Sequence, residues 1–228
     1  VALLAKVLIK KDSYDHATVY YSAEDMLNAC RKEPLFEPKF IFYKTDAWKL
    51  IDKKSRESFE YFIKSFKKNI EVFDTPSYFK DINKYHQIIH ETDLANNFSE
   101  YYKKNKKKLS SYMQKAIANG NKYSAKEYAE AIDFIKRSYE SYKEVFEDYH
   151  GVLSPSSPGV APKGLKSTGT AEFNKFWSFM GTPCISLPLL QGENNLPLGV
   201  QLIGDKYDDQ RFLGIARWLE QKSKGFNE

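Results

Sequence analysis

GVLSPSSPGVAPKGL, residues 151–165, leads into STGTAEFNKFWSFMGTPCISLPLL, residues 167–190, and then into ENNLPLGVQLIGDKYDDQRFLGIARWLE, residues 193–220. Apolar runs in this stretch are short and are separated by proline and glycine, a pattern typical of strands joined by turns. The runs are Val152–Leu153, Cys184–Leu190 and Leu198–Ile203. We therefore predict three strands, with a short helix at Glu172–Met180 and a closing helix that Asp208 caps.

The second and third of these strands are expected to form an antiparallel hairpin. They are predicted at Cys184–Leu187 and Gly199–Ile203, and Asn194 and Asn195 stand in the turn between them. Both segments are apolar throughout, which is typical of strands buried on both faces. The first strand ends at Pro155, and the loop that leaves it is a place where α/β proteins hold ligands.

The chain before residue 151 has a different pattern. Two short apolar runs, Lys39–Tyr43 and Asn69–Phe73, predict strands. Between them an apolar stripe with helical spacing begins at Thr45 or Asp46 and continues to Phe66. This order of strand, helix and strand predicts a βαβ unit with parallel strands. Residues 76–150 are helical in pattern, with a C-cap at Gly120 and a capping box formed by Ser124 and Glu127. The predicted fold class is α/β, a mixed sheet covered by helices. Its parts are residues 1–75 (helix plus βαβ), 76–150 (helical cover) and 151–228 (strands and closing helix).

Composition narrows the functional classes. The chain has 228 residues, a formal net charge of +5 and two cysteines, Cys30 and Cys184. Two distant cysteines favour free thiols and a cytoplasmic protein, and no apolar run reaches the roughly 18 residues of a membrane span. The lysine run Lys103–Lys108 resembles a nucleic-acid patch. Without aromatic residues interleaved in it, a solvated turn is favoured, and nucleic acid is not expected as a partner.

The first residues, VALLAKVLIKKD, are amphipathic from Val1 onward and carry no capping residue. This pattern favours a cut inside a longer protein and an incomplete domain. It predicts an exposed apolar surface on Val1–Ile9 and an unpaired sheet edge.

No complete catalytic or metal-binding constellation emerges from spacing alone. His16, His86, His90 and His150 are the only histidines, and the i,i+4 pair His86 and His90 lacks the glutamate that follows the first histidine in helical zinc motifs. Ser156 and Ser157 lie in the proline-rich loop, but Lys163 and Lys166, the nearest candidate bases, would be solvated and protonated. No metal, cofactor or catalytic residue is assigned.

The ordered motifs of residues 151–220 resemble the C-terminal part of the amidase-signature family: A-P, T-G, F-N-x-x-W, G-x-P and L-P-x-G-x-Q-L-I-G. The resemblance implies an enzyme that hydrolyses carboxylic amides with a Ser–Ser–Lys triad located before residue 1. It implies substrate-cleft positions at Thr168, Gly169, Phe173, Asn174 and Trp177, although core packing explains Phe173 and Trp177 equally well. The implied partners are a small amide substrate, the N-terminal part of the same protein and, as an open case, a second copy of the chain.

Two alternatives remain open. One is a non-catalytic helical interaction or RNA-binding module that uses Lys103–Lys108. The other keeps the family but makes the chain part of the ammonia-supplying subunit of a tRNA-dependent amidotransferase.

Overall fold

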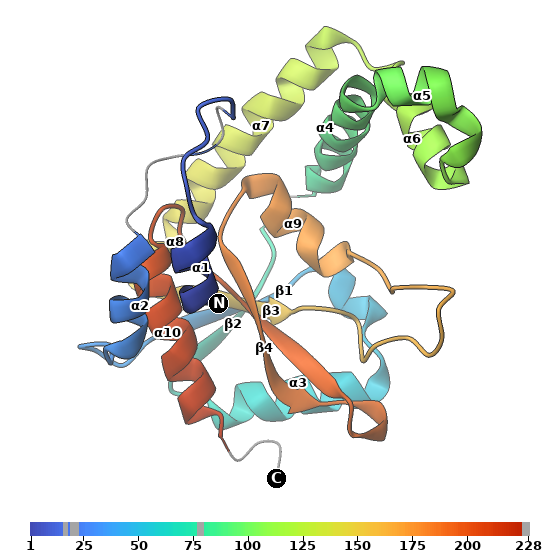
Figure 1. The fold of residues 1–228 in the computed structure, drawn as a ribbon. Helices are drawn as coiled ribbons and strands as arrows, with labels where there is room; N and C mark the ends of the chain where they lie inside the picture. Colours follow the sequence, from blue (N-terminus) through green and yellow to red (C-terminus); the bar gives the residue numbers. More distant parts are fainter. Residues whose placement is uncertain (16–17, 19–22, 77–79, 225–228) are drawn as a thin grey trace. The chain divides into compact units, whose positions relative to one another are not determined.

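The computed structural model describes residues 1–15, 18, 23–76 and 80–224, which separate into two compact units (Figure 1). Unit 1 contains residues 1–75, 145–177 and 181–228, and unit 2 contains residues 76–144 and 178–180. His16 lies outside the described residues. No helix within the described ranges is both long and apolar enough to cross a bilayer.

Unit 1 is built on a five-stranded mixed sheet of order β2-β1-β3-β5-β4. The strands are β1 (Phe40–Lys44), β2 (Ile70–Asp74), β3 (Gly151–Pro155), β4 (Cys184–Gln191) and β5 (Pro197–Ile203). β1 pairs in parallel with both β2 and β3, which confirms the predicted βαβ unit. β5 pairs antiparallel with β3 and β4, which confirms the predicted hairpin.

The helices of unit 1 cover this sheet and one another. They are α1 (Ala2–Leu8), α2 (Ala23–Arg31), α3 (Lys53–Ser65), α8 (Val145–Asp148), α9 (Glu172–Met180, whose last three residues belong to unit 2) and α10 (Asp209–Lys222). α10 packs on α2 and contacts β4, and α1 packs on α2. The core includes Phe40, Phe42 and Phe59, each fully buried.

Two helix caps predicted in unit 1, at Thr45 or Asp46 and at Asp208, do not form. The helix expected from Thr45 or Asp46 is broken into a 3₁₀ turn, η1 (Asp46–Leu50), and α3, because Asp52 caps α3 by accepting a hydrogen bond from Ser55 N at 2.8 Å. Asp208 occupies the position before α10, but its side chain makes no cap hydrogen bond and pairs with Arg211.

The two outer strands of the sheet are exposed. β4 was predicted to be buried on both faces, but Cys184, Ser186 and Pro188, which alternate along one face of the strand, are exposed. β5, which lies inside the sheet, is buried along most of its length. The apolar side chains of Val1, just before α1, and of Leu4 and Val7 on α1 are also exposed, as the sequence predicted.

Unit 2 is helical. Its elements are α4 (Ile82–Asn97), α5 (Ser99–Asn105), η3 (Lys106–Lys108), α6 (Ser111–Gly120) and α7 (Ala125–Lys143). α4 packs against α6 and α7. The capping box of Ser124 and Glu127 is present as predicted. Gly120 is not a C-cap. It is the last residue of α6, where a Cβ would lie 1.9 Å from the carbonyl oxygen of Glu91.

Candidate functional site

A chain of hydrogen bonds at the carboxyl end of β3 ties this strand to β5 and α9. Trp177 Nε1 donates to Ser154 Oγ at 3.3 Å, and Ser154 Oγ donates to Gln201 Oε1 at 3.4 Å. Gln201 Nε2 donates to Asn174 Oδ1 at 3.1 Å, and Asn174 Nδ2 donates to the carbonyl oxygen of Ser156 at 3.3 Å. Both ends of the Asn174 carboxamide thus have a partner, which fixes its orientation.

Two hydroxyl groups extend the network toward solvent. Ser156 Oγ and Ser186 Oγ are 2.7 Å apart, and both lie over Gly199, where a Cβ would come within 2.4 Å of Ser186 Oγ and 2.7 Å of Ser156 Oγ. Ser156 is half-buried and Ser186 is exposed. Among the described residues, neither hydroxyl hydrogen-bonds to an amine, an imidazole or a carboxylate. The pair can therefore contact a polar ligand, but it lacks the base that a serine nucleophile needs.

The five residues predicted to line a substrate cleft fall into three environments. Thr168 and Gly169 lie in an exposed loop, and Gly169 adopts a φ of 90°, which favours glycine. Phe173 and Trp177 are core residues, with exposed fractions of 2% and 1%. Asn174 lies between these environments, half-buried within the polar network. Of the five, only Asn174 combines a fixed polar group with partial access to solvent.

Sequence reasoning missed Ser186 and Gln201. Both lie in runs that were treated as uniformly apolar strands. The alternation Cys184, Ser186 and Pro188 would have placed one face of β4 toward solvent, and it was the available signal for Ser186. Gln201 carries a polar side chain in an otherwise apolar strand, and such a residue needs a buried partner.

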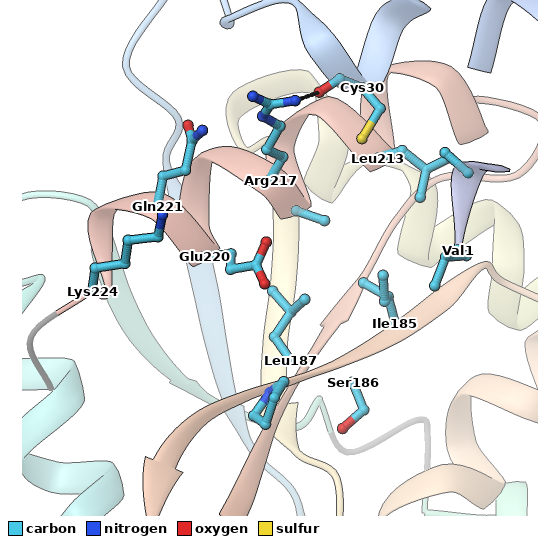
Figure 2. A pocket seen from close by; sticks show the side chains of 13 residues that line it. Val1, Cys30, Ile185, Ser186, Leu187, Leu213, Arg217, Glu220, Gln221 and Lys224 are labelled. Atoms are coloured by element: carbon cyan, nitrogen blue, oxygen red, sulfur yellow. Dashed lines mark hydrogen bonds between the residues drawn. The ribbon is translucent and has the colours of Figure 1, made fainter. Parts of the chain in front are cut away.

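A cavity of about 550 Å³ opens beside the exposed edge of β4 (Figure 2). Ile185 and Leu187 from β4 and Leu213 from α10 give it apolar walls, and Arg217 and Glu220 from α10 carry charge at its side. It is lined by residues 1, 2, 30, 185–188, 213, 216, 217, 220, 221 and 224. Arg217 Nη1 donates to the carbonyl oxygen of Cys30 at 3.4 Å, which links α10 to α2 at the rim.

The histidines do not assemble a metal site in the part of the chain that the structure describes. The rings of His86 and His90 stack with centroids 5.8 Å apart, and no group of three or more histidine, cysteine or acidic residues is placed to hold a metal ion there. His150 stacks on Phe36, and burial lowers the pKa of its imidazole. Lys163 and Lys166 are exposed in the loop after β3, as expected.

The family model for amidases matches residues 1–213. A glutamyl-tRNA(Gln) amidotransferase subunit of Alkaliphilus metalliredigens is 36% identical over 109 residues, which are 44% of this chain and 22% of that protein. Fatty acid amide hydrolase of Arabidopsis thaliana is 26% identical over 126 residues, 50% of this chain and 21% of that protein.

Solved structures share the fold. 6-Aminohexanoate cyclic dimer hydrolase superposes with a TM-score of 0.76 at 14% identity, and the match covers 100% of this chain and 53% of that one. The glutamyl-tRNA(Gln) amidotransferase subunit of Thermotoga maritima superposes with a TM-score of 0.66 at 22% identity, covering 98% of this chain and 50% of that one. The chain thus spans about half the length of these solved structures, and its sequence matches cover about a fifth of the curated relatives.

Proposed function

The chain belongs to the amidase-signature family, whose model matches residues 1–213, and from this premise we propose that it forms part of an enzyme that hydrolyses carboxylic amides. In this role it supplies part of the central sheet and one wall of the substrate cleft. The observation that carries the proposal is the polar network at the end of β3, where Asn174 is held by Gln201 and Ser156 in the middle of the matched motifs.

The nucleophile and its base come from residues other than 1–228, either in the same polypeptide or in a second one. Amide hydrolysis by a serine requires a base that removes the hydroxyl proton and donors that hold the developing oxyanion. Ser156 and Ser186 hydrogen-bond to each other, and no base reaches them among the described residues. The Ser–Ser–Lys triad of the family would meet both demands, so residues 1–228 alone should not turn over an amide.

Three of the predicted cleft positions are proposed to face the substrate and two to support them. Thr168 and Gly169 are exposed, and the Asn174 carboxamide can donate to a carbonyl or accept from an amide N–H of the substrate. Phe173 and Trp177 lie behind them in the core, and the indole N–H of Trp177 reaches the network through Ser154. In this division the exposed residues contact the substrate and contribute to substrate specificity, and the two aromatic residues hold them in position.

The stretch that carries the nucleophile is proposed to pack on the apolar face of α1 and on the cavity beside β4. Val1 and the α1 residues Leu4 and Val7 expose large apolar side chains, and β4 has an unpaired edge. Surfaces of this kind are normally covered by further structure. This chain matches about half the length of the two solved structures, whose remaining polypeptide is long enough to cover both surfaces.

The test uses a C-terminal affinity tag on this chain, expressed in its source cells, so that any continuous or associated polypeptide is recovered with it. The recovered material should hydrolyse a simple aryl or aliphatic amide, and the isolated 228 residues should not. In the active material, Asn174→Asp should raise KM several-fold, because it replaces an amide donor by a carboxylate.

Asn28→Asp is the matched control, since Asn28 is exposed on α2. It should leave KM and kcat unchanged. Turnover by the isolated chain, or an Asn174→Asp enzyme with unaltered KM, would contradict the assignment.

A second candidate function within the family is that of the ammonia-supplying component of a tRNA-dependent amidotransferase. The matches to glutamyl-tRNA(Gln) amidotransferase subunits from several organisms favour it. Substrate choice distinguishes the two: glutamine hydrolysis that depends on a co-purifying protein supports the amidotransferase, and hydrolysis of a free amide without that protein supports the hydrolase.

A further inference from the structure

The positive charge of the chain is concentrated in one segment of unit 2. Residues 98–122, which include α5, η3 and α6, contain seven lysines and one glutamate, a net charge of +6 in 25 residues. The whole chain carries +5, so all other residues together carry −1. The lysine surface, defined as Lys103, Lys104 and Lys106–Lys108, is exposed throughout.

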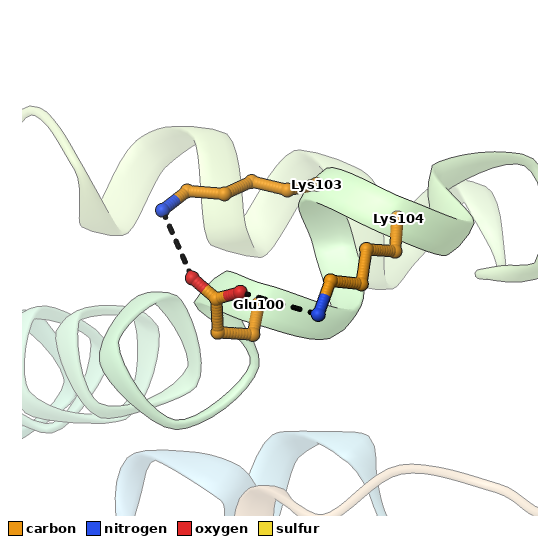
Figure 3. Close-up of polar contacts among 3 residues, drawn as sticks. All are labelled: Glu100, Lys103 and Lys104. Carbon is orange, nitrogen blue, oxygen red and sulfur yellow. Dashed lines mark hydrogen bonds and ion pairs between the residues drawn. The ribbon is translucent and has the colours of Figure 1, made fainter.

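Acidic side chains do little to neutralise this surface. Glu100 pairs with Lys103 at 3.1 Å and with Lys104 at 3.6 Å (Figure 3). These lysine side chains are 71% and 74% exposed, and ion pairs so open to water are weak. Within the described residues, Lys106, Lys107 and Lys108 make no ion pair. One carboxylate therefore serves five ammonium groups.

Aromatic rings flank the lysines on both sides. Tyr101 is 45% exposed and Tyr112 is 66% exposed, and Lys106 Nζ lies 5.1 Å from the ring centroid of Tyr102. The sequence interpretation gave these rings no weight because they stand before and after the lysine run. The structure shows that they remain accessible, which supplies the aromatic component that a lysine run alone lacks.

The chemistry of the flanking residues favours one class of polyanion. The large exposed hydrophobic side chains of residues 98–122 are all aromatic, and the aliphatic Leu109 is half-buried. A membrane-binding helix would instead present a continuous exposed face of Leu, Phe or Trp, and in residues 98–122 Phe98 is the one exposed side chain of these types. Single-stranded nucleic acid offers phosphates for ammonium groups and base faces for rings.

The segment has a fixed scaffold within unit 2. Ile117 of α6 is fully buried, and Gly120 lets α6 approach the backbone of α4 at Glu91. The Glu91 carboxylate accepts hydrogen bonds from Asn119 at 3.3 Å and from Tyr123 at 3.0 Å. These contacts hold α6, and with it Tyr112, in a defined position against α4.

We propose that the lysine surface binds single-stranded nucleic acid without sequence preference, with Tyr101 and Tyr112 stacking on bases. Residues 98–122 contain no arginine, the side chain that reads guanine bidentately, so the lysines contact phosphates as point charges. No feature of the surface selects the 2′-hydroxyl, so RNA and DNA should bind alike. This binding is independent of the proposed amide chemistry, which resides in unit 1.

The experiment measures fluorescence anisotropy of a labelled oligo(U) of about 15 nucleotides and its oligo(dT) counterpart with the full chain. Neutralising about five phosphates on a single strand gives a slope of log K against log salt of about −3.5, so affinity should fall about 100-fold between roughly 50 and 200 mM KCl. A variant with Lys106→Gln, Lys107→Gln and Lys108→Gln should flatten the slope to about −1.4. Tyr112→Ala should weaken binding about tenfold, within the range of one lost stacking contact.

The matched control removes the same charge elsewhere. Lys64, Lys67 and Lys68 are exposed in unit 1, and changing all three to Gln should leave both slope and affinity unaltered. Circular dichroism checks that each variant is folded, and replacing Lys106–Lys108 by Arg should preserve binding.

Three outcomes would overturn the proposal: no binding at about 50 mM KCl, equal losses in the two triple Gln variants, or tighter binding to anionic phospholipid vesicles than to the oligonucleotides.

Discussion

Replacing Asn174 by Leu should destabilise unit 1 by about 2 kcal/mol, because it leaves a buried donor without an acceptor. Gln201 is 6% exposed, and its Nε2 donates to Asn174 Oδ1 at 3.1 Å. A buried polar group that loses its partner costs about 1–3 kcal/mol. The change also removes the hydrogen bond to the Ser156 carbonyl, which is half-buried and can recover part of that loss with water.

A double-mutant cycle tests the origin of this loss. Gln201→Met alone should also destabilise, since it leaves Asn174 Oδ1 unpaired, but Asn174→Leu combined with Gln201→Met removes both partners. The double variant should therefore cost less than the sum of the single variants, with a coupling of about 1–2 kcal/mol. Urea unfolding followed by tryptophan fluorescence gives the values, and Asn28→Leu on exposed α2 should stay within about 0.5 kcal/mol of the wild type. Additive losses, or a loss below about 0.5 kcal/mol in Asn174→Leu, would refute the inferred network.

The effects of three further substitutions follow from the immediate surroundings of a single residue. Gly120→Ala should destabilise unit 2 by about 1–3 kcal/mol, because the new Cβ would lie 1.9 Å from the Glu91 carbonyl oxygen and overpack the α4–α6 contact. Helix propensity alone predicts the opposite, a gain in stability. Urea unfolding and hydrogen exchange in α4 and α6 measure the change in stability. Asp52→Ala should cost about 1–2 kcal/mol in thermal or urea unfolding, because it removes the cap hydrogen bond from Ser55 N. Cys184 as a residue is exposed on β4, but local desolvation of its thiol raises the thiol pKa to about 11. Iodoacetamide should therefore alkylate Cys184 about 100-fold more slowly at about pH 7.5 than a free cysteine, and rapid alkylation in the native protein would contradict a desolvated thiol. Stability should fall from about pH 9 to 11 because the thiol of the unfolded chain ionises first, and Cys184→Ala should remove that fall.

Much of the fold follows from sequence because apolar periodicity and turn residues agree locally. The parallel pair β1 and β2, the hairpin of β4 and β5 and the capping box at Ser124 were predicted from such local patterns. The errors have tertiary causes. Asp52 interrupts the apolar stripe and caps the start of α3. Its backbone N–H donates to the carbonyl oxygen of Pro158, a contact distant in sequence that local patterns do not predict.

The candidate site was predictable only in part. The F-N-x-x-W motif located Asn174, but the environments of its neighbours differ: Phe173 and Trp177 are core residues and Thr168 is exposed. Whether a residue in α9 faces the core or the network depends on the sheet beneath it. The alternation along β4 could have placed Ser186 on the solvent face, but its hydrogen bond with Ser156 depends on the strand order β3-β5-β4, which sequence periodicity does not specify.

The most direct measurement of the central claim is the site at which a serine-directed fluorophosphonate modifies the amide-hydrolysing protein recovered through a tag on this chain. Mass spectrometry of the inactivated material locates the adduct. The account predicts a serine outside residues 1–228, with hydrolysis abolished. An adduct on Ser156, Ser157 or Ser186, formed as activity is lost, would contradict it.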